Sequence, residues 1–151
     1  ILTRRACARC DAVGAAVAEE AGEAMLFSAE ERLEMAREVF RERPNVEVTA
    51  CSGLTVEFGR KCGTNVLLRG MRAVSDFDYE LQLAILNRKL DQGVESLFLM
   101  NAARWLVIRS SSIKAAARLN GNIESMVPEL GRKRLLEKFG RPYTPAANGD
   151  D

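Results

Sequence analysis

The stretch VLLRGMRAVSDFDYELQLAILNRKL, residues 66–90, decides the fold class. Its beginning belongs to a continuous apolar run, 65–69, that predicts a buried strand, and its second part, 75–90, predicts a helix. Arg69 and Arg72 lie on either side of Gly70 and Met71, where that strand is expected to end. A turn between a strand and a helix does not require charge, so two guanidinium groups here indicate a local site for an anion.

Helical and strand patterns alternate on both sides of this stretch. Ser28 and Glu31 form a capping box that begins one helix, and Gly63 and Gly93 end two others. Short apolar strands that alternate with helices predict an α/β fold with a doubly wound parallel sheet, covered by helices on both faces. Ligands of such sheets bind beyond the carboxyl ends of the strands, where Arg69 is expected. The expected strands are 12–18, 46–51, 65–69 and 94–100, and the expected helices are 1–10, 27–43, 54–62, 75–90, 111–119 and 128–139.

The composition is that of an ordinary globular domain. Of the 151 residues, 47% are hydrophobic and 28% are charged, and this length is that of about one domain. Because the last expected helix ends at 139, we expect the domain over 1–139 and a disordered tail over 140–151. A net charge of +1 provides no field that attracts nucleic acid or a membrane, so we expect neither as a partner. No apolar run approaches the roughly 20 residues of a membrane span, and no signal peptide is visible.

The sequence contains no histidine, which removes imidazole acid–base chemistry, Ser-His-Asp and Cys-His triads and His-ligated zinc. Four cysteines remain, and Cys7 and Cys10 form a C-x-x-C with no second such pair to complete a zinc site. One alternative is a redox or metal-binding role. The other, which the alanine-rich surroundings favour, is that these are small reduced thiols in an intracellular protein.

Apolar residues surround much of the expected helix 75–90. A helix that is apolar on more than one side is buried on more than one side. The second side is either a contact between subunits, which favours a homo-oligomer, or part of a well-covered core. Glu80 and Asn87 lie among these residues, and Glu80 is either a partner for a ligand or an arginine, or a solvated or structural acid. One apolar stripe consists of Tyr79, Leu83, Leu86 and Leu90, and other directions hold Phe77, Leu81 and Ile85.

Three serines, Ser110 to Ser112, precede an alanine-rich helix that carries Lys114. A helix N-terminus offers unpaired N–H groups and partial positive charge, and serine hydroxyls add donors, so a phosphate can bind there. Plain N-capping is the other interpretation of the serines. Together with the arginines at a strand end, the segment predicts a phosphate-rich ligand held by positioned donors.

The stretch NVLLRGMRAVSDFDYELQLAILNRKL, residues 65–90, closely resembles the R-G-L-R-A-V-S-D-F-x-Y-E-x-Q-x-A-x-x-N-R signature of phosphopantetheine adenylyltransferases. The resemblance extends over about 1–139 and includes LFSAEERLEMAREVF, NVEV and SGL. It implies a Rossmann-like nucleotidyltransferase that moves an adenylyl group from ATP to 4′-phosphopantetheine with Mg²⁺, giving dephospho-coenzyme A and pyrophosphate in coenzyme A biosynthesis. Coenzyme A is a further ligand that it implies, and it places the protein in the cytoplasm as a homohexamer.

The same resemblance implies roles for individual residues. Arg69 would hold the phosphate of phosphopantetheine, and Asn87 would line the same pocket, with Glu23 and Thr55 at further positions for this substrate. The mechanism it implies is direct in-line attack by that phosphate on the α-phosphorus, helped by positioning and charge neutralisation. The ATP site would consist of Gly70, Met71, Arg72, Tyr79, Glu80, Trp105, Leu106, Val107, Ile108, Arg109, Ser110 and Ser111.

Several positions differ from the family pattern. The T-x-G-H motif, whose histidine stabilises the transition state, is expected just before Ile1, so no residue of this chain is assigned a catalytic role. Glu23 stands where the family has a substrate-binding lysine, Arg109 replaces the first serine of its segment, and Thr55 replaces an apolar residue. Two further functions therefore stay open: an impaired homologue that assembles and binds nucleotide or coenzyme A, and a nucleotidyltransferase with another acceptor.

Overall fold

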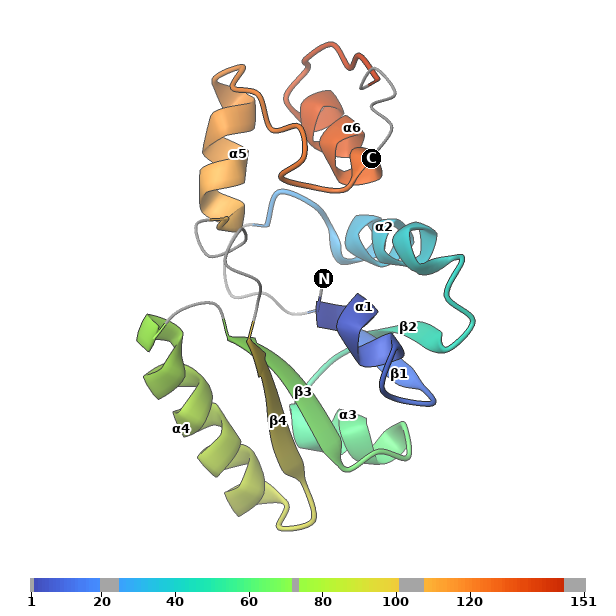
Figure 1. The fold of residues 1–151 in the computed structure, drawn as a ribbon, viewed down its shortest axis with the longest axis vertical. Helices are drawn as coiled ribbons and strands as arrows, with labels where there is room; N and C mark the ends of the chain where they lie inside the picture. The colour runs from blue at the N-terminus through green and yellow to red at the C-terminus, as the bar shows by residue number, and fades with distance from the viewer. Residues whose placement is uncertain (1, 20–24, 72–73, 101–107, 146–151) are drawn as a thin grey trace. The chain divides into compact units, whose positions relative to one another are not determined.

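The computed structural model describes residues 2–19, 25–71, 74–100 and 108–145 (Figure 1). The chain divides into two compact units, 1–106 and 107–151. The first unit holds the four described strands, and the second holds the last two helices. The predicted domain over 1–139 therefore spans both units.

Helices and strands alternate in the predicted order, and each predicted element is present. Within the described ranges, no helix combines the length and the apolar character that crossing a membrane requires. The elements are α1 (Leu2–Cys7), β1 (Val13–Ala18), α2 (Ala29–Phe40), β2 (Val46–Cys51), α3 (Thr55–Lys61), β3 (Val66–Met71), α4 (Val74–Leu90), β4 (Glu95–Met100), α5 (Ser110–Arg118) and α6 (Glu129–Lys138).

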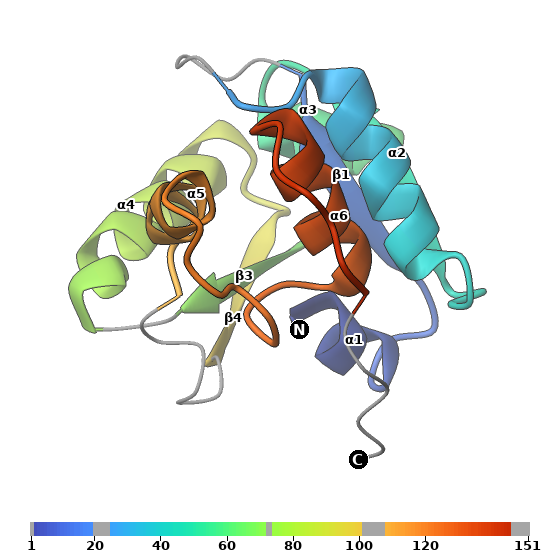
Figure 2. The same cartoon turned by 90° about the horizontal axis from the view of Figure 1, so that it is seen from above.

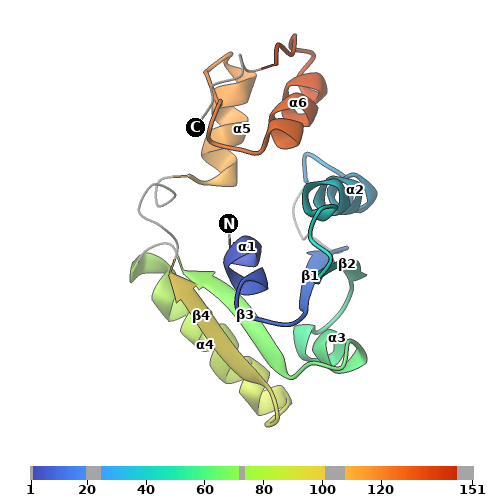
Figure 3. The ribbon, with the colours of Figure 1, turned by 45° about the vertical axis from the view of Figure 1, so that its right-hand side comes forward.

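All described strand pairs are parallel, as the alternating pattern predicts. In one two-stranded sheet β1 pairs with β2, with Val13 opposite Val46, and in the other β3 pairs with β4, with Val66 opposite Glu95. α2 packs on β1 and β2 (Figure 2), and α4 packs on β3 and β4 (Figure 3). Each parallel pair is therefore joined through a crossover helix, which is the repeating unit of an α/β fold.

The prediction that 12–18 is a buried strand is wrong for its side chains. Along β1, half-buried residues alternate with exposed ones. In the described part of the chain β1 has one partner strand, β2, and contacts the helices α1 and α2, and this cover leaves every second side chain exposed.

The capping box at the start of α2 is present as predicted. The Ser28 hydroxyl accepts a hydrogen bond from the Glu31 backbone N–H at 3.1 Å, and the Glu31 carboxylate accepts one from the Ser28 N–H at 2.8 Å. These two bonds satisfy backbone donors that a helix N-terminus otherwise leaves unpaired. α2 ends at Phe40, before Pro44 is reached.

The side of α4 that packs on the sheet differs from the predicted stripe. Half-buried positions along α4 recur at the helical spacing of three and four residues, and of the predicted stripe only Leu83 is among them. Tyr79 is 63% exposed, Leu86 50% and Leu90 47%. The sheet side of α4 is instead largely polar, because it carries the partner of a charged residue in β3, described below. Its half-buried residues are Asp76, Glu80, Leu83, Ala84 and Asn87.

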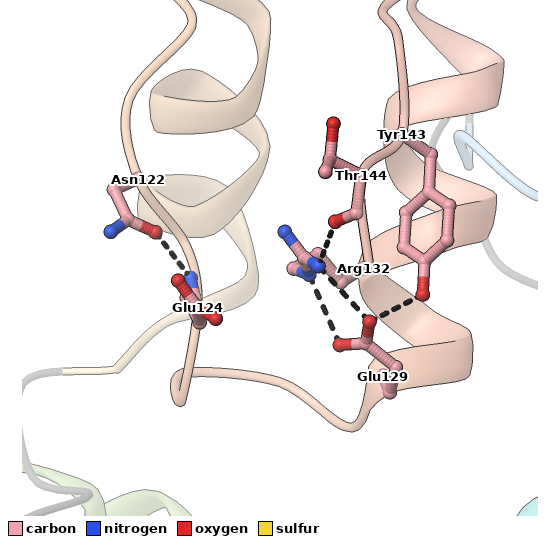
Figure 4. Close-up of polar contacts among 6 residues, drawn as sticks. All are labelled: Asn122, Glu124, Glu129, Arg132, Tyr143 and Thr144. Atoms are coloured by element: carbon pink, nitrogen blue, oxygen red, sulfur yellow. Dashed lines mark hydrogen bonds and ion pairs between the residues drawn. The ribbon is translucent and has the colours of Figure 1, made fainter. Parts of the chain in front are cut away.

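The second unit consists of α5, α6 and the segments that follow them. A polar network connects α6 to the residues after it (Figure 4). The Arg132 guanidinium binds the Glu129 carboxylate at 3.0 and 3.1 Å and also donates to the Thr144 carbonyl, and the Tyr143 hydroxyl donates to Glu129. Arg132 also lies 5.0 Å from the centroid of the Tyr143 ring. Within the predicted tail 140–151, residues 143 and 144 therefore contact α6.

Candidate functional site

Arg69 lies within β3 rather than at its end. The strand was expected to finish at residue 69, but Gly70 and Met71 continue it because they pair with Leu99 and Met100 of β4. The side chain of Arg69 is 42% exposed, so solvent and a ligand can reach part of it.

Glu80 of α4 holds the guanidinium of Arg69 through two parallel hydrogen bonds. Arg69 Nε donates to Glu80 Oε2 at 2.8 Å, and Nη2 donates to Oε1 at 3.0 Å. The Glu80 side chain is only 12% exposed. This two-bond geometry is the strong and directional form of an arginine–carboxylate pair. The sequence named Glu80 as a partner for a ligand or for an arginine, and the structure shows the second pairing.

The pair fixes the charge of Arg69. The hydrogen bonds to Glu80 raise the pKa of Arg69 above its ordinary value, against the effect of partial burial, which lowers it. The guanidinium is therefore a permanent cation at any physiological pH. Because the carboxylate of Glu80 neutralises this cation, the pair has no net charge. Its main effect is to fix the orientation of the guanidinium.

Asn87 lies on the same side of α4 as Glu80. Seven residues separate the two, which is close to two helical turns, and both are half-buried on the face that packs toward the sheet. Tyr79, the neighbour of Glu80, is 63% exposed and therefore points in a different direction. The expected grouping of Arg69 with Asn87 is thus compatible with the helix geometry, whereas Tyr79 and Glu80 lie on different faces.

The N-terminus of α5 belongs to the second unit. Arg109 is its N-cap residue, with extended backbone angles, and makes no side-chain capping bond. Ser110 and Ser111 are exposed in the first turn of this helix, so they are helical residues rather than caps. Their hydroxyls and the first N–H groups of the helix remain the donors that a phosphate would use.

The remaining expected site residues have simple placements. Thr55 is the exposed first residue of α3, and Ile108 is half-buried just before α5. Glu23, Arg72, Trp105, Leu106 and Val107 lie outside the described residues.

The cysteines show no sign of a metal or redox centre in the part of the chain that the structure describes. All four are free, and no group of three potential metal ligands is present among the described residues. Burial raises the pKa of the Cys51 thiol, with a smaller contribution from Cys62. A raised pKa lowers the fraction of reactive thiolate.

Sequence patterns missed one ion pair at the C-terminal end of α4, away from Glu80. Arg60 at the end of α3 binds Asp91, just after α4, at 2.5 Å, and Asp91 also accepts the Gly93 N–H at 3.0 Å. The first contact links residues 31 positions apart, so no local periodicity could reveal it. It ties the C-terminal end of α4 to α3.

Comparisons with known proteins agree with the signature in 65–90. Residues 2–116 match the model of the cytidylyltransferase-like family. The chain is 49% identical over 142 residues to the phosphopantetheine adenylyltransferase of Nitratidesulfovibrio vulgaris. The aligned residues are 94% of this chain and 76% of that protein. The chain belongs to the phosphopantetheine adenylyltransferase family.

Other members of the family are nearly as similar. The phosphopantetheine adenylyltransferase of Oleidesulfovibrio alaskensis is 44% identical over 142 residues, with 94% of this chain and 84% of that protein covered. The phosphopantetheine adenylyltransferase of Desulforudis audaxviator is 46% identical over 137 residues, with 91% of this chain and 84% of that protein covered. Membership confirms the Rossmann-type α/β class and the nucleotidyltransferase assignment that the sequence predicted.

Proposed function

We propose that this chain transfers an adenylyl group from ATP to 4′-phosphopantetheine, giving dephospho-coenzyme A and pyrophosphate. The observation that carries the proposal is its 49% identity to a phosphopantetheine adenylyltransferase over 94% of its length. The local geometry supports it, because the arginine of the family signature, Arg69, is held in place by the half-buried carboxylate of Glu80.

On the acceptor side, we assign the phosphate of 4′-phosphopantetheine to Arg69. A guanidinium matches the geometry of a phosphate and can bind it through two parallel bonds. Asn87 lies two turns further along the same side of α4, where its amide can donate to or accept from the rest of the acceptor. Thr55 and Glu23 complete the proposed acceptor positions.

On the nucleotide side, we assign the triphosphate to Arg72 and to the exposed N-terminus of α5, with Ser110 and Ser111 as hydroxyl donors. Gly70 and Met71 lie in β3 next to Arg69, and the rest of the proposed nucleotide site consists of Tyr79, Glu80, Trp105, Leu106, Val107, Ile108 and Arg109. Mg²⁺ would arrive with ATP and neutralise its phosphates, and no residue of this chain is assigned to hold it.

The chemistry that these residues supply is positioning and charge neutralisation. The acceptor phosphate attacks the α-phosphorus in line with the departing pyrophosphate, and no covalent intermediate with the protein is needed. Holding both phosphates in that geometry avoids the entropy cost of a bimolecular encounter. Fixed donors aimed at the developing charge lower the barrier further.

We also propose that the protein is a homo-oligomer, a hexamer by its family, and that it functions in the cytoplasm. The outer side of α4 supports the assembly, because Phe77 is 47% exposed, Leu81 40% and Ile85 50%. An exposed apolar surface of this kind along one helix is typical of an interaction site.

The reaction is tested by incubating the chain with ATP, Mg²⁺ and 4′-phosphopantetheine. Pyrophosphate release is measured by a coupled assay, and dephospho-coenzyme A is identified by its mass. Pantetheine, which lacks the phosphate, is the matched control and should give no product. Equal turnover of the two acceptors, or product only with a different phosphorylated acceptor, would contradict the proposal.

An impaired member of the family is the second candidate. It is favoured by Arg109, an exposed cation at the N-cap of α5 where the family has a serine, and by Glu23, which replaces a lysine. Such a chain would bind ATP or coenzyme A in calorimetry while its adenylyl transfer is depressed by several orders of magnitude. Glu23→Lys should then strengthen the binding of 4′-phosphopantetheine, because it removes repulsion between like charges.

A further inference from the structure

The Arg69–Glu80 pair uses only one edge of the guanidinium. The carboxylate occupies Nε and Nη2, which form the side edge of the group. Among the described residues, Nη1 takes part in no hydrogen bond. The end edge, made by Nη1 and the second hydrogen of Nη2, is therefore free to bind an anion through two parallel bonds.

The guanidinium of Arg69 is more accessible than the carboxylate of Glu80, as a site that binds an anion through Arg69 requires. Glu80 is 12% exposed and Arg69 is 42% exposed, so the carboxylate is enclosed while part of the guanidinium can be reached. The side chains come from β3 and α4, which pack against each other. The ion pair between Arg60 and Asp91 holds the far end of α4. Arg69 and Glu80 thus both lie in regular secondary structure, which positions side chains better than loops do.

We propose that Glu80 is a positioning residue for Arg69: it fixes the guanidinium by its side edge and presents the end edge to an anionic ligand. The inference rests on the proposed function in one respect, that the anion is the phosphate of 4′-phosphopantetheine. Glu80 then acts through Arg69 and does not need to touch the acceptor.

This role has a cost that decides how it is tested. A carboxylate near the ligand phosphate repels it, and the neutral pair attracts an anion less than a lone arginine would. An unsupported arginine, however, must be immobilised when the ligand binds. Since Arg69 is partly exposed to solvent, the repulsion is screened, and we expect the loss of orientation to dominate.

Glu80→Gln keeps the shape of the side chain but removes the charge and one of the two parallel bonds, because its amide nitrogen cannot accept from an N–H donor. We expect binding of 4′-phosphopantetheine, measured by calorimetry, to weaken by about three- to tenfold, the usual cost of ordering a long side chain at an interface. Binding of pantetheine should not change. In an Arg69→Ala background, Glu80→Gln should cause no further weakening. Asp78→Asn is the matched control, since it removes one charge from the exposed side of the same helix and should leave both affinities unchanged.

A ligand-free readout separates this inference from the proposed function. In nitrogen-15 NMR spectra of the chain, the Nε–H signal of Arg69, assigned by its loss in Arg69→Lys, should be protected from exchange with water. Glu80→Gln should lower the protection, and Asp78→Asn should preserve it. If the chain does not discriminate 4′-phosphopantetheine from pantetheine, the proposed function fails, while the NMR result still decides the positioning role.

Three results would overturn the inference. The first is an unprotected Arg69 signal in the unchanged chain. The second is equal or tighter binding of 4′-phosphopantetheine by Glu80→Gln, which would mean that the carboxylate only repels. The third is equal weakening for pantetheine, which would mean that Glu80 merely supports the fold.

Discussion

Replacing Ile85 by glutamate should separate the subunits of the proposed homo-oligomer. Ile85 is 50% exposed, and with Phe77 and Leu81 it forms an apolar ridge of residues four apart along α4. Complete burial of such a side chain contributes about 1.5–3 kcal/mol, so the part that each still exposes corresponds to about 1 kcal/mol. A twofold contact that uses the ridge of both copies therefore gains about 6 kcal/mol from these residues.

The glutamate removes the share of Ile85 and adds a carboxylate that must be buried without a partner, at roughly 2 kcal/mol or more. Together the two effects correspond to about a hundredfold weaker association for each of the two Ile85 residues in a contact. Sedimentation velocity at micromolar concentration should show the unchanged chain as an oligomer and Ile85→Glu as a smaller species. Gln82→Glu is the control, because it adds the same charge at an exposed polar position of the same helix. A monomeric unchanged chain, or an Ile85→Glu variant that sediments like it, would refute the reasoning.

Three further predictions concern stability and order. The pKa of Asp91 is lowered, mainly by its hydrogen bond from an arginine, so its stabilising effect is complete above the unfolded-state pKa and is lost as the pH falls further. Asp91→Asn should therefore flatten the loss of stability below about pH 4, followed by circular dichroism, and an unchanged acid transition would contradict this. Ser28→Ala should lower the free energy of unfolding by about 1 kcal/mol in a urea titration, whereas Ser28→Thr should retain most of it. Arg132→Ala should speed chymotrypsin cleavage near residues 143 and 144, and Lys133→Ala, an exposed neighbour, should not; equal rates would mean that the network in Figure 4 does not hold this segment.

The positions of helices and strands could be predicted because their signals are local. The strand 46–51 was predicted to the residue, and the capping box at Ser28 marked the start of α2 correctly. Glycine at positive φ accounts for the turn after α3, where Gly63 has a φ of 70°. Each of these signals lies within a few residues of the structure that it determines.

Contacts between distant parts of the chain could not be predicted in the same way. The period of a strand says that one face is covered, but not which strand lies beside it, so the two separate parallel pairs were not foreseen. The ion pair of Arg60 with Asp91 and the bond of Arg132 to Thr144 join residues 31 and 12 positions apart. Charged residues are common on every surface, and the sequence alone does not say which of them meet.

The sequence showed that α4 is apolar on more than one side, but it did not show which side packs on the sheet. Apolar character shows that a side chain tends to leave water, but it does not identify the surface that covers it. In α4 the sheet-facing side carries Glu80 and Asn87, which suit a site, and Glu80 is stabilised there by its bonds to Arg69. Most of the large apolar side chains of α4 are consequently exposed on the sides of the helix that do not pack on the sheet.

This distribution means that α4 gains little hydrophobic stabilisation from its own sheet. Among its half-buried residues only Leu83 and Ala84 are apolar. Over residues 76–90, where the burial of α4 is described, six of the seven larger apolar side chains are at least 40% exposed. A helix whose apolar surface faces away from its own sheet depends on something else to cover it. The surface that a second copy would cover and the carboxylate that binds Arg69 are therefore parts of one helix, so that assembly would stabilise the same helix on which the proposed phosphate site is built.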